Sequence, residues 1–294
     1  MGIQESFVDK ARVARWWTKE DDGRVRCGMC FRKCLIPLGK TGGCGVRTNV
    51  DGVLESPYLG LFCSLAIDPI EKKPLYHWRQ GTSILSLGSI GCTMDCPFCQ
   101  NYSIAHPVRI PSLRRLSIAD CITVCKERGL SSVAFTYNEP TLQAEYICEA
   151  APFFAEAGIA IVLVTNGMFT KEVAEALVAC VAAVNIDVKT FTEKHYKRMG
   201  GRLAQVKDNV ELFVKAGCHV EVTRLIVPKL ADDPDDFMAF ITWLAGINSA
   251  IPLHLSRYFP AHTYSEPATE RSVLEKFFTL AAQKLEHVHL GNIV

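Results

Sequence analysis

The chain has 294 residues, of which 49% are hydrophobic and 21% are charged. This composition excludes a disordered or fibrous protein, and the length allows one large domain or two ordinary ones. A balance of 32 Lys and Arg against 31 Asp and Glu leaves a net charge of +1, so no overall field draws the chain to nucleic acid or to an anionic membrane, and we expect neither as a partner.

The unusual feature of the composition is its 13 cysteines. Disulfide scaffolds are normally short and secreted, whereas this chain is long and its cysteine count is odd. Its first residues, MGIQESFVDKARVARWW, lack the apolar core of a signal peptide. The sequence also contains no run of about 18 apolar residues, the length that is needed to span a membrane. We therefore expect a reduced, cytoplasmic protein whose clustered thiols bind metal.

Residues 1–82 are Gly-rich and basic and contain no repeated strand–helix unit. They carry the spacing Cys27-x2-Cys30-x3-Cys34-x9-Cys44, and four thiolates can close a zinc site or an iron–sulfur cluster. Zinc ribbons pair two Cys-x2-Cys knuckles, and only one is present here, so iron–sulfur is favoured over zinc. We predict a small N-terminal cysteine-rich cap that binds a second metal centre and packs on the rest of the chain.

Two features of the cap bear on its role. Basic residues flank the four cysteines and would offset the charge of four thiolates: Arg24, Arg26, Arg32, Lys33 and Arg47. The polar segment DPIEKKPLYH, residues 68–77, is interpreted as a loop near the mouth of the following domain, either a surface linker or a substrate loop.

From residue 83 to residue 294, strand-like and helix-like patterns alternate. The predicted strands are apolar runs rich in Val and Ile, typical of parallel strands buried on both faces. They cover 83–89, 131–137, 159–166, 182–189, 219–228, 251–260 and 287–294, with helices at 117–129, 139–158, 171–182, 194–200, 203–217, 233–247 and 270–285. Such repeated units predict an α/β fold, either a barrel or an open wound sheet.

Polar residues collect where these predicted strands end. In a (β/α) barrel the carboxyl ends of the strands carry the active site, so the pattern supports a functional mouth. The residues concerned are Asn138, Glu139, Thr165, Asn166, Asp187, Lys189, Arg224 and His254 through Arg257.

A second cysteine set, Cys92-x3-Cys96-x2-Cys99, directly follows the strand at 83–89. Three thiolates in one loop can hold three irons of a [4Fe–4S] cluster and leave the fourth iron open to a ligand, as catalytic zinc sites keep an open position. Gly91 lets the backbone leave the strand sharply, and Phe98 can shield the cluster or offer its backbone to a planar ring. The alternative is a zinc or structural site.

The remaining cysteines fall in apolar patterns, and we predict that they are core thiols without a metal. They are Cys63, Cys121, Cys125, Cys148, Cys180 and Cys218.

In this position the Cys-x3-Cys-x2-Cys spacing resembles the signature of radical SAM enzymes, which cleave S-adenosylmethionine (SAM) to methionine and a 5′-deoxyadenosyl radical. Nearly the whole chain is similar to the AmmeMemoRadiSam group, related to pyruvate formate-lyase activating enzyme, through segments such as RCGMCFRKC, TYNEPT, VTNG, NIDVK and EVTRLIVP. The resemblance implies a partial (β/α)6 TIM-like barrel over 83–294, with the cap over 1–82. It also implies an electron donor such as flavodoxin or ferredoxin.

The resemblance assigns the catalytic cluster to Cys92, Cys96 and Cys99. Tyr137, Asn138 and Glu139 occupy the place of a Gly-Gly-Glu-type segment that meets the SAM amino group, with Asn138 standing for a glycine.

Barrel residues further along the chain match positions near SAM. Asn166 matches a residue near the ribose or carboxylate. Asp187 and Lys189 match an Asp-x-Lys pair whose lysine faces the SAM carboxylate. Arg224 matches an arginine near the methionyl group, and His254 a histidine near the ribose. The alternatives are structural salt bridges for Lys189 and Arg224 and a structural histidine for His254.

These observations predict an enzyme that abstracts hydrogen from an unidentified small-molecule or protein substrate. A glycyl-radical activase and a radical SAM methyltransferase are alternatives. Activases usually place extra clusters after the motif, and no cysteine follows Cys218 to act as a methyl carrier. A non-catalytic iron–sulfur protein that transfers electrons or delivers clusters is an alternative from another class.

Overall fold

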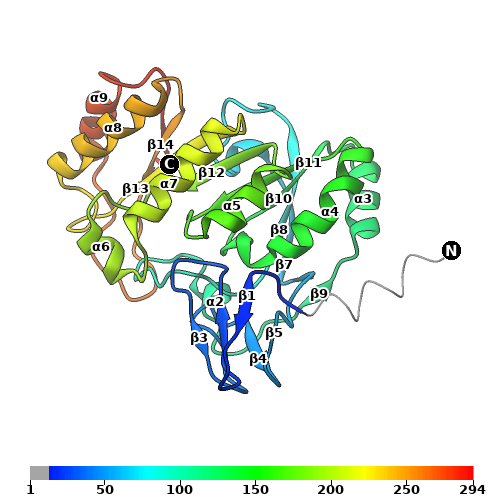
Figure 1. The fold of residues 1–294 in the computed structure, drawn as a ribbon. Helices are drawn as coiled ribbons and strands as arrows, with labels where there is room; N and C mark the ends of the chain where they lie inside the picture. Colours follow the sequence, from blue (N-terminus) through cyan, green and yellow to red (C-terminus); the bar gives the residue numbers. More distant parts are fainter. Residues whose placement is uncertain (1–12, 294) are drawn as a thin grey trace.

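The computed structural model describes residues 13–293. Its centre is a sheet in the order β15-β14-β13-β12-β11-β10-β8-β7. All neighbours in it are parallel except β7 and β8. The strands are β7 (Ser64–Pro69), β8 (Ser83–Gly88), β10 (Ser132–Phe135), β11 (Ala160–Thr165), β12 (Ala183–Asp187), β13 (His219–Ile226), β14 (Leu253–Arg257) and β15 (Val288–Gly291). The curved sheet confirms the predicted α/β partial barrel (Figure 1).

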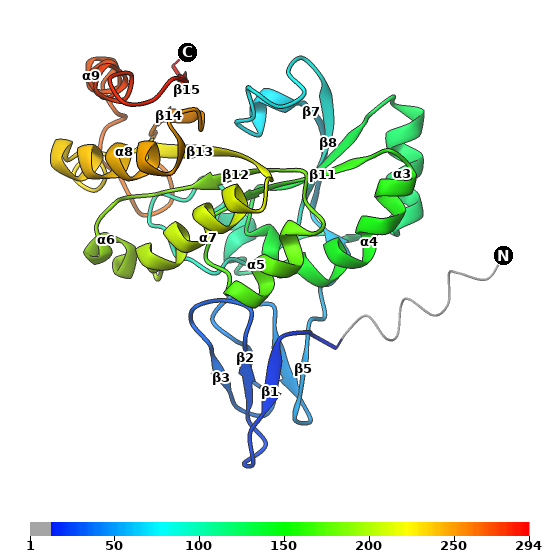
Figure 2. The same ribbon diagram turned by 45° about the horizontal axis from the view of Figure 1, so that its top comes forward.

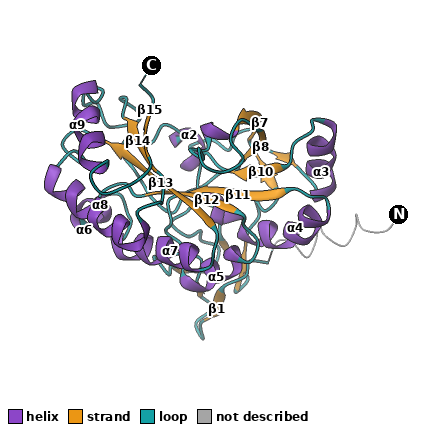
Figure 3. Ribbon diagram, turned by 90° about the horizontal axis from the view of Figure 1, so that it is seen from above, coloured by secondary structure: helices purple, strands orange, loops and turns teal. Residues whose placement is uncertain are grey.

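Helices line the outer side of the sheet, as Figure 3 shows from above. The longer ones are α3 (Ile118–Glu127), α4 (Ala144–Glu156), α5 (Lys171–Val178), α7 (Leu203–Lys215), α8 (Pro234–Asn248) and α9 (Arg271–Ala281). Short ones are α2 (Tyr102–Ala105), α6 (Glu193–Arg198) and the 3-10 turns η1 (Ile70–Lys72) and η2 (Pro140–Gln143). Helices cover one face of the sheet, and packed side chains cover the other. Because both faces of the strands are buried, their sequences are unbroken apolar runs. Six strand–helix units precede β15, as predicted.

The cap consists of short antiparallel strands that lie below the helical layer in Figure 2. Strands β1 (Trp17–Lys19), β2 (Val25–Cys27) and β3 (Leu35–Ile36) form one sheet, and β4 (Thr48–Val50) pairs with β5 (Val53–Glu55). A third pair joins β6 (Leu61–Phe62) of the cap to β9 (Arg114–Arg115). Cap and barrel side chains share one hydrophobic core, so the cap packs on the barrel.

The structure corrects one expectation about the cap. Residues 68–77 lie at the amino ends of the barrel strands rather than at the mouth. Because β7 runs antiparallel to β8, the chain that follows β7 emerges at the opposite end of the barrel. There Ile70 and Leu75 pack against barrel side chains, and the Asn185 side-chain amide donates to the Pro74 carbonyl at 2.8 Å. The segment therefore closes the floor of the barrel.

The cysteines outside the two sets differ in exposure. Cys121 and Cys125 of α3 are buried, as predicted, whereas the other four are only half-buried: Cys63, Cys148, Cys180 and Cys218. The signal-peptide expectation rests partly on residues 1–12, which lie outside the described residues. Within residues 13–293, no helix is both long and apolar enough to cross a membrane.

Candidate active site

The Cys92 loop leaves the barrel at the carboxyl end of β8. Asn138, from the loop after β10, holds this exit: its Oδ1 accepts from the Ser89 N–H at 3.0 Å and its Nδ2 donates to the Gly91 carbonyl at 2.9 Å. Gly91 has φ +92°, and a Cβ there would lie 2.8 Å from the Cys44 carbonyl oxygen. Only glycine fits this backbone conformation and this space, which agrees with the sharp exit from the strand expected at Gly91. The close approach of Gly91 to Cys44 also brings the two cysteine loops into contact.

The thiols of Cys92, Cys96 and Cys99 lie on this one loop. The Asn166 Nδ2 donates to Cys92 Sγ at 3.6 Å, so the predicted SAM-site residue Asn166 is beside the cysteine loop. Burial raises the pKa of all three thiols, that of Cys96 to about 12. Metal ligation requires thiolates, so a bound metal would displace these protons.

Asp187 is the last residue of β12 and Lys189 follows it, and both lie beside the same loop. The Lys189 ammonium is 2.6 Å from Asp187 Oδ2, and both side chains are mostly buried. Burial is the main cause of the raised pKa of Cys96, while the Lys189 charge acts in the opposite direction. A lysine in this place can form a charge-assisted bond to a carboxylate ligand.

Glu139 and Tyr137 are held by bonds within the protein. Glu139 is buried, and its carboxylate accepts from the Thr165 hydroxyl at 2.7 Å and the Asn166 N–H at 3.0 Å, which joins the ends of β10 and β11. Tyr137 has φ +75°, a conformation that favours glycine, and its hydroxyl donates to Asp68 Oδ2 at 2.8 Å inside the barrel. Both side chains therefore hydrogen-bond within the protein.

Arg224 and His254 are not brought to the cysteine loop. Residues alternate in β13, and Arg224 faces outward, where its guanidinium pairs with Asp236 of α8. His254 is the second residue of β14, near the amino end, and its Nε2 lies 2.6 Å from Glu221 Oε2. Their assigned contacts with SAM stay predictions that this geometry does not support, and the structural alternatives describe what is observed.

A loop that sequence reasoning missed covers the Cys92 loop. The Thr263 N–H donates to the Pro97 carbonyl at 3.0 Å, and the His262 ring stacks on Tyr102 with centroids 3.5 Å apart. Phe98 is buried, with its ring edge-on to Tyr264, which agrees with a shielding role. The position of this loop after β14 was the only signal in the sequence that could have indicated it.

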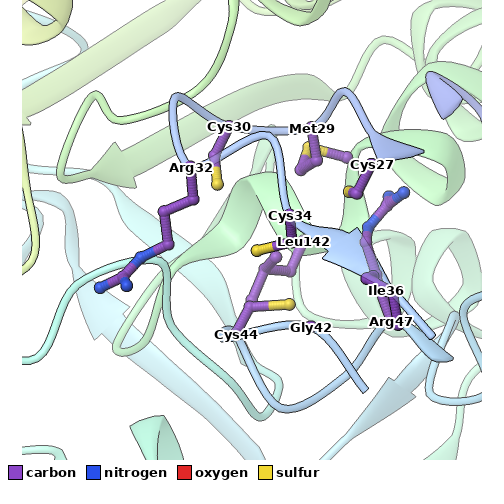
Figure 4. Close-up of a pocket in the computed structure, with 10 residues that line it drawn as sticks. All are labelled: Cys27, Met29, Cys30, Arg32, Cys34, Ile36, Gly42, Cys44, Arg47 and Leu142. Atoms are coloured by element: carbon purple, nitrogen blue, oxygen red, sulfur yellow. The ribbon is translucent and has the colours of Figure 1, made fainter. Parts of the chain in front are cut away.

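The four cap cysteines line one cavity. Figure 4 shows the sulfur atoms of Cys27, Cys30, Cys34 and Cys44 around a common space, with Arg47 beside Cys27. Within residues 13–293, no three His, Cys, Asp or Glu side chains form a group ready to hold a metal ion.

Of the other basic residues predicted near the cap cysteines, Arg32 also lines the cavity, whereas Arg24 and Arg26 do not. Arg24 and Arg26 pair with acidic groups at the surface, and the Arg32 Nε donates to the Thr93 carbonyl at 2.9 Å. This last bond is a second link between the cap cysteine loops and the Cys92 loop.

The barrel, the loop after its first parallel strand and the three thiols on that loop define a class of protein. The chain belongs to the Radical SAM superfamily, whose family model matches residues 87–244, more than half of the chain. The protein is therefore a radical SAM enzyme, and its family implies a [4Fe–4S] cluster and SAM as cofactors.

Three similar proteins place the chain further. An uncharacterized protein of Methanocaldococcus jannaschii, MJ0808, is 37% identical over 287 residues, covering 96% of this chain and 85% of that one. A putative glycyl-radical enzyme activating enzyme of the same organism, MJ1227, is 27% identical over 155 residues, covering 49% of this chain and 62% of that one. The crystal structure of Streptococcus suis SuiB bound to S-adenosylmethionine has a TM-score of 0.54 at 16% identity, covering 69% of this chain and 48% of that one. At this identity, the last similarity shows the fold alone.

Proposed function

We propose that Cys92, Cys96 and Cys99 hold the [4Fe–4S] cluster and that the enzyme cleaves SAM reductively to act on an unidentified substrate. The observation that carries the proposal is the placement of three half-buried thiols on one loop, beside the Lys189–Asp187 pair and Asn166, at the carboxyl end of the barrel. Held by Cys92, Cys96 and Cys99, such a cluster would supply the electron for reductive cleavage of SAM to methionine and a 5′-deoxyadenosyl radical, the species that would take a hydrogen atom from the substrate.

The protein's own residues have distinct tasks in this proposal. Lys189 binds the SAM carboxylate and shares its charge between that group and Asp187. Asn166 orients the Cys92 thiolate through its amide. The loop of residues 261–264 covers the cysteine loop and keeps water from it, and a one-electron donor of the flavodoxin or ferredoxin class supplies the electron.

The reaction subtype is narrowed only by similarity. The 27% identity to a protein named as a putative glycyl-radical enzyme activating enzyme favours an activase as the second candidate, for which the substrate would be a protein loop. Membership of the AmmeMemoRadiSam group and a methyltransferase reaction stay predictions.

The free thiols suit a reducing compartment such as the cytoplasm.

We further propose that Cys27, Cys30, Cys34 and Cys44 hold a second metal centre, with iron–sulfur favoured over zinc. Their shared cavity supports this, and the apolar side chains of Met29, Ile36 and Leu142 form part of its wall. Four thiolates that line a cavity suit a cluster of several irons, whereas zinc needs all four sulfurs about 2.3 Å from a single ion.

One experiment tests both centres. The protein is reconstituted anaerobically, its iron and zinc are counted, and 5′-deoxyadenosine is measured after reduction and addition of SAM. Cys96→Ala should abolish 5′-deoxyadenosine and leave the cap metal in place, whereas Cys27→Ala should remove only the cap metal. Cys218→Ala, a half-buried thiol outside both sets, is the matched control and should change neither. Intact clusters without 5′-deoxyadenosine in the unaltered protein would refute the proposed function.

A further inference from the structure

Arg47 is a charged side chain enclosed within the cap. It is 0% exposed, and its Nη2 lies 2.5 Å from Glu145 Oε1 of α4. Its Nη1 donates to the Arg15 carbonyl at 3.3 Å. Among the described residues, the Nε atom of Arg47 has no hydrogen-bond partner. A buried donor without an acceptor costs about 1–3 kcal/mol, so a protein that keeps one has a reason to do so.

The position of Arg47 indicates what the missing acceptor is. Its side chain lines the same cavity as the four cap cysteines, and Figure 4 shows its guanidinium beside Cys27. Neutral thiols are weak acceptors, whereas metal-bound thiolates carry negative charge. Glu145 already balances the guanidinium through Nη2, so Nε is left to pair with a second anionic group.

We propose that the cap cavity holds an iron–sulfur cluster whose built-in counter-ion is Arg47, donating from Nε to a cluster sulfur and stabilising the cluster's one-electron reduced form. This inference rests on the second metal centre proposed above. The reduction adds one electron, supplied by a one-electron donor of the ferredoxin or flavodoxin class, and makes the centre more negative by one charge. Hydrogen bonds to the sulfurs and local charge are among the factors that set the reduction potential of such clusters.

Glu145 positions Arg47 in this arrangement. Its carboxylate accepts a hydrogen bond from the Arg47 Nη2 and another from the Arg15 N–H, the latter at 2.9 Å. The pair therefore fixes the guanidinium from the barrel side, through α4. Zinc has no redox chemistry, so a zinc centre would gain nothing from a cation that favours a reduced state.

The test isolates the cap centre in the full-length chain by replacing Cys92, Cys96 and Cys99 with alanine. Iron and zinc are counted, and the midpoint potential is measured by an anaerobic redox titration followed by electron paramagnetic resonance. Arg47 is changed to Lys alone, and to Met together with Glu145→Gln, so that no buried charge is left unpaired. Arg26→Met is the matched control, since Arg26 is another cap arginine but pairs with Glu20 at the surface.

We expect iron in the cap and a midpoint that moves to more negative potential in both Arg47 variants. A tenfold loss of preference for the reduced form corresponds to about 59 mV for one electron. The Arg26 variant should keep the unaltered midpoint. The inference would be overturned if the cap contained zinc and no iron, or if the midpoint potential of the cluster were the same in the Arg47 variants as in the unaltered chain. If the double variant does not fold, the Lys variant decides, because it keeps the charge and loses Nε.

The proposed function is judged separately, by 5′-deoxyadenosine from the protein with all its cysteines. Loss of that product with a normal cap potential would refute SAM cleavage and leave the inference standing.

Discussion

Lys189 is a residue to which we assign both a structural task and the binding of a ligand. It is bonded to Asp187 at 2.6 Å, yet its charge also reaches the Cys96 thiol. Replacing Lys189 with Met should remove one charge-assisted bond to the SAM carboxylate, a loss of about 1.5–3 kcal/mol, or roughly 10- to 100-fold in SAM affinity. Equilibrium binding of SAM to the reconstituted enzyme measures this.

Lys171→Met is the control for this prediction, because Lys171 forms an exposed pair with Glu175 on α5. It should leave SAM affinity unchanged. Equal affinities in the Lys189 variant and the unaltered enzyme would remove Lys189 from the SAM site.

Glu221 makes the stability of the protein sensitive to acid. Burial opposes ionisation of Glu221, but bonds from His219, His254 and the N–H groups of Tyr76 and His77 outweigh it and hold the pKa at about 2, below its ordinary value of 4.5. The carboxylate's contribution is complete above about pH 4.5 and is lost as the pH falls toward 2. The shift corresponds to about 3 kcal/mol.

Urea unfolding at pH 7 and pH 3 tests the role of Glu221. Glu221→Gln should lower the free energy of unfolding by about 3 kcal/mol at pH 7 and flatten its decline toward acid. Glu275→Gln, which alters an exposed pair with Arg271, should follow the unaltered protein. The same acid decline in the Glu221 variant would contradict the prediction.

Among the structural elements, the loop of residues 261–264 contacts the Cys92 loop, and we propose that it protects a cluster there. Its His262 ring lies 3.5 Å from Tyr102 of α2. His262→Ala removes a stacked pair that contributes about 0.5–1.5 kcal/mol, so iron at Cys92, Cys96 and Cys99 should be lost to air roughly 2- to 10-fold faster. Iron release from each site is followed by its absorbance and its electron paramagnetic resonance signal.

The matched control is His287→Ala, which alters a ring in contact with His77, 4.3 Å away, at the floor of the barrel. Iron loss should then match the unaltered enzyme. Faster loss from the cap centre in the His262 variant would show general loosening rather than local protection.

The helices and strands of the barrel were largely predictable from the sequence. The direction in which a strand runs and the face on which its side chains lie were less predictable. Helix α3 begins where Ser117 and Asp120 form a capping box, a local signal that the sequence carries. Nothing local revealed that β7 joins the sheet in reverse, and this reversal sends residues 68–77 to the floor. The outward face of Arg224 depends on the register of β13, which a continuous apolar run does not disclose.

The candidate site was predictable to a similar extent. The two cysteine sets stood out because metal spacing is local in sequence. The Asn138 bonds to Ser89 and Gly91 and the Arg47–Glu145 pair join residues far apart in the chain, so no sequence pattern announces them.

At the scale of the whole molecule, the division between residues 1–82 and 83–294 does not coincide with the sheet. Strand β7 and the floor segment belong to the barrel's hydrogen bonding and core. A chain beginning at Ser83 should therefore fail to fold, because it lacks an edge strand and the buried Ile70 and Leu75. Chemical unfolding should show no cooperative transition for this chain, in contrast to the full-length chain. A cooperative transition from Ser83 would establish an independent barrel.

The bond between Arg47 and Glu145 has a consequence for biosynthesis. Its partners are 98 positions apart, and the cap cysteines precede both α4 and the Cys92 loop. At about 5–20 residues per second, the ribosome exposes the cap thiols for roughly 5–20 s before Glu145 is made. The cap cavity cannot be complete during that interval, so we expect the proposed cap metal to be inserted after translation has passed α4, although the four cysteines are synthesised first.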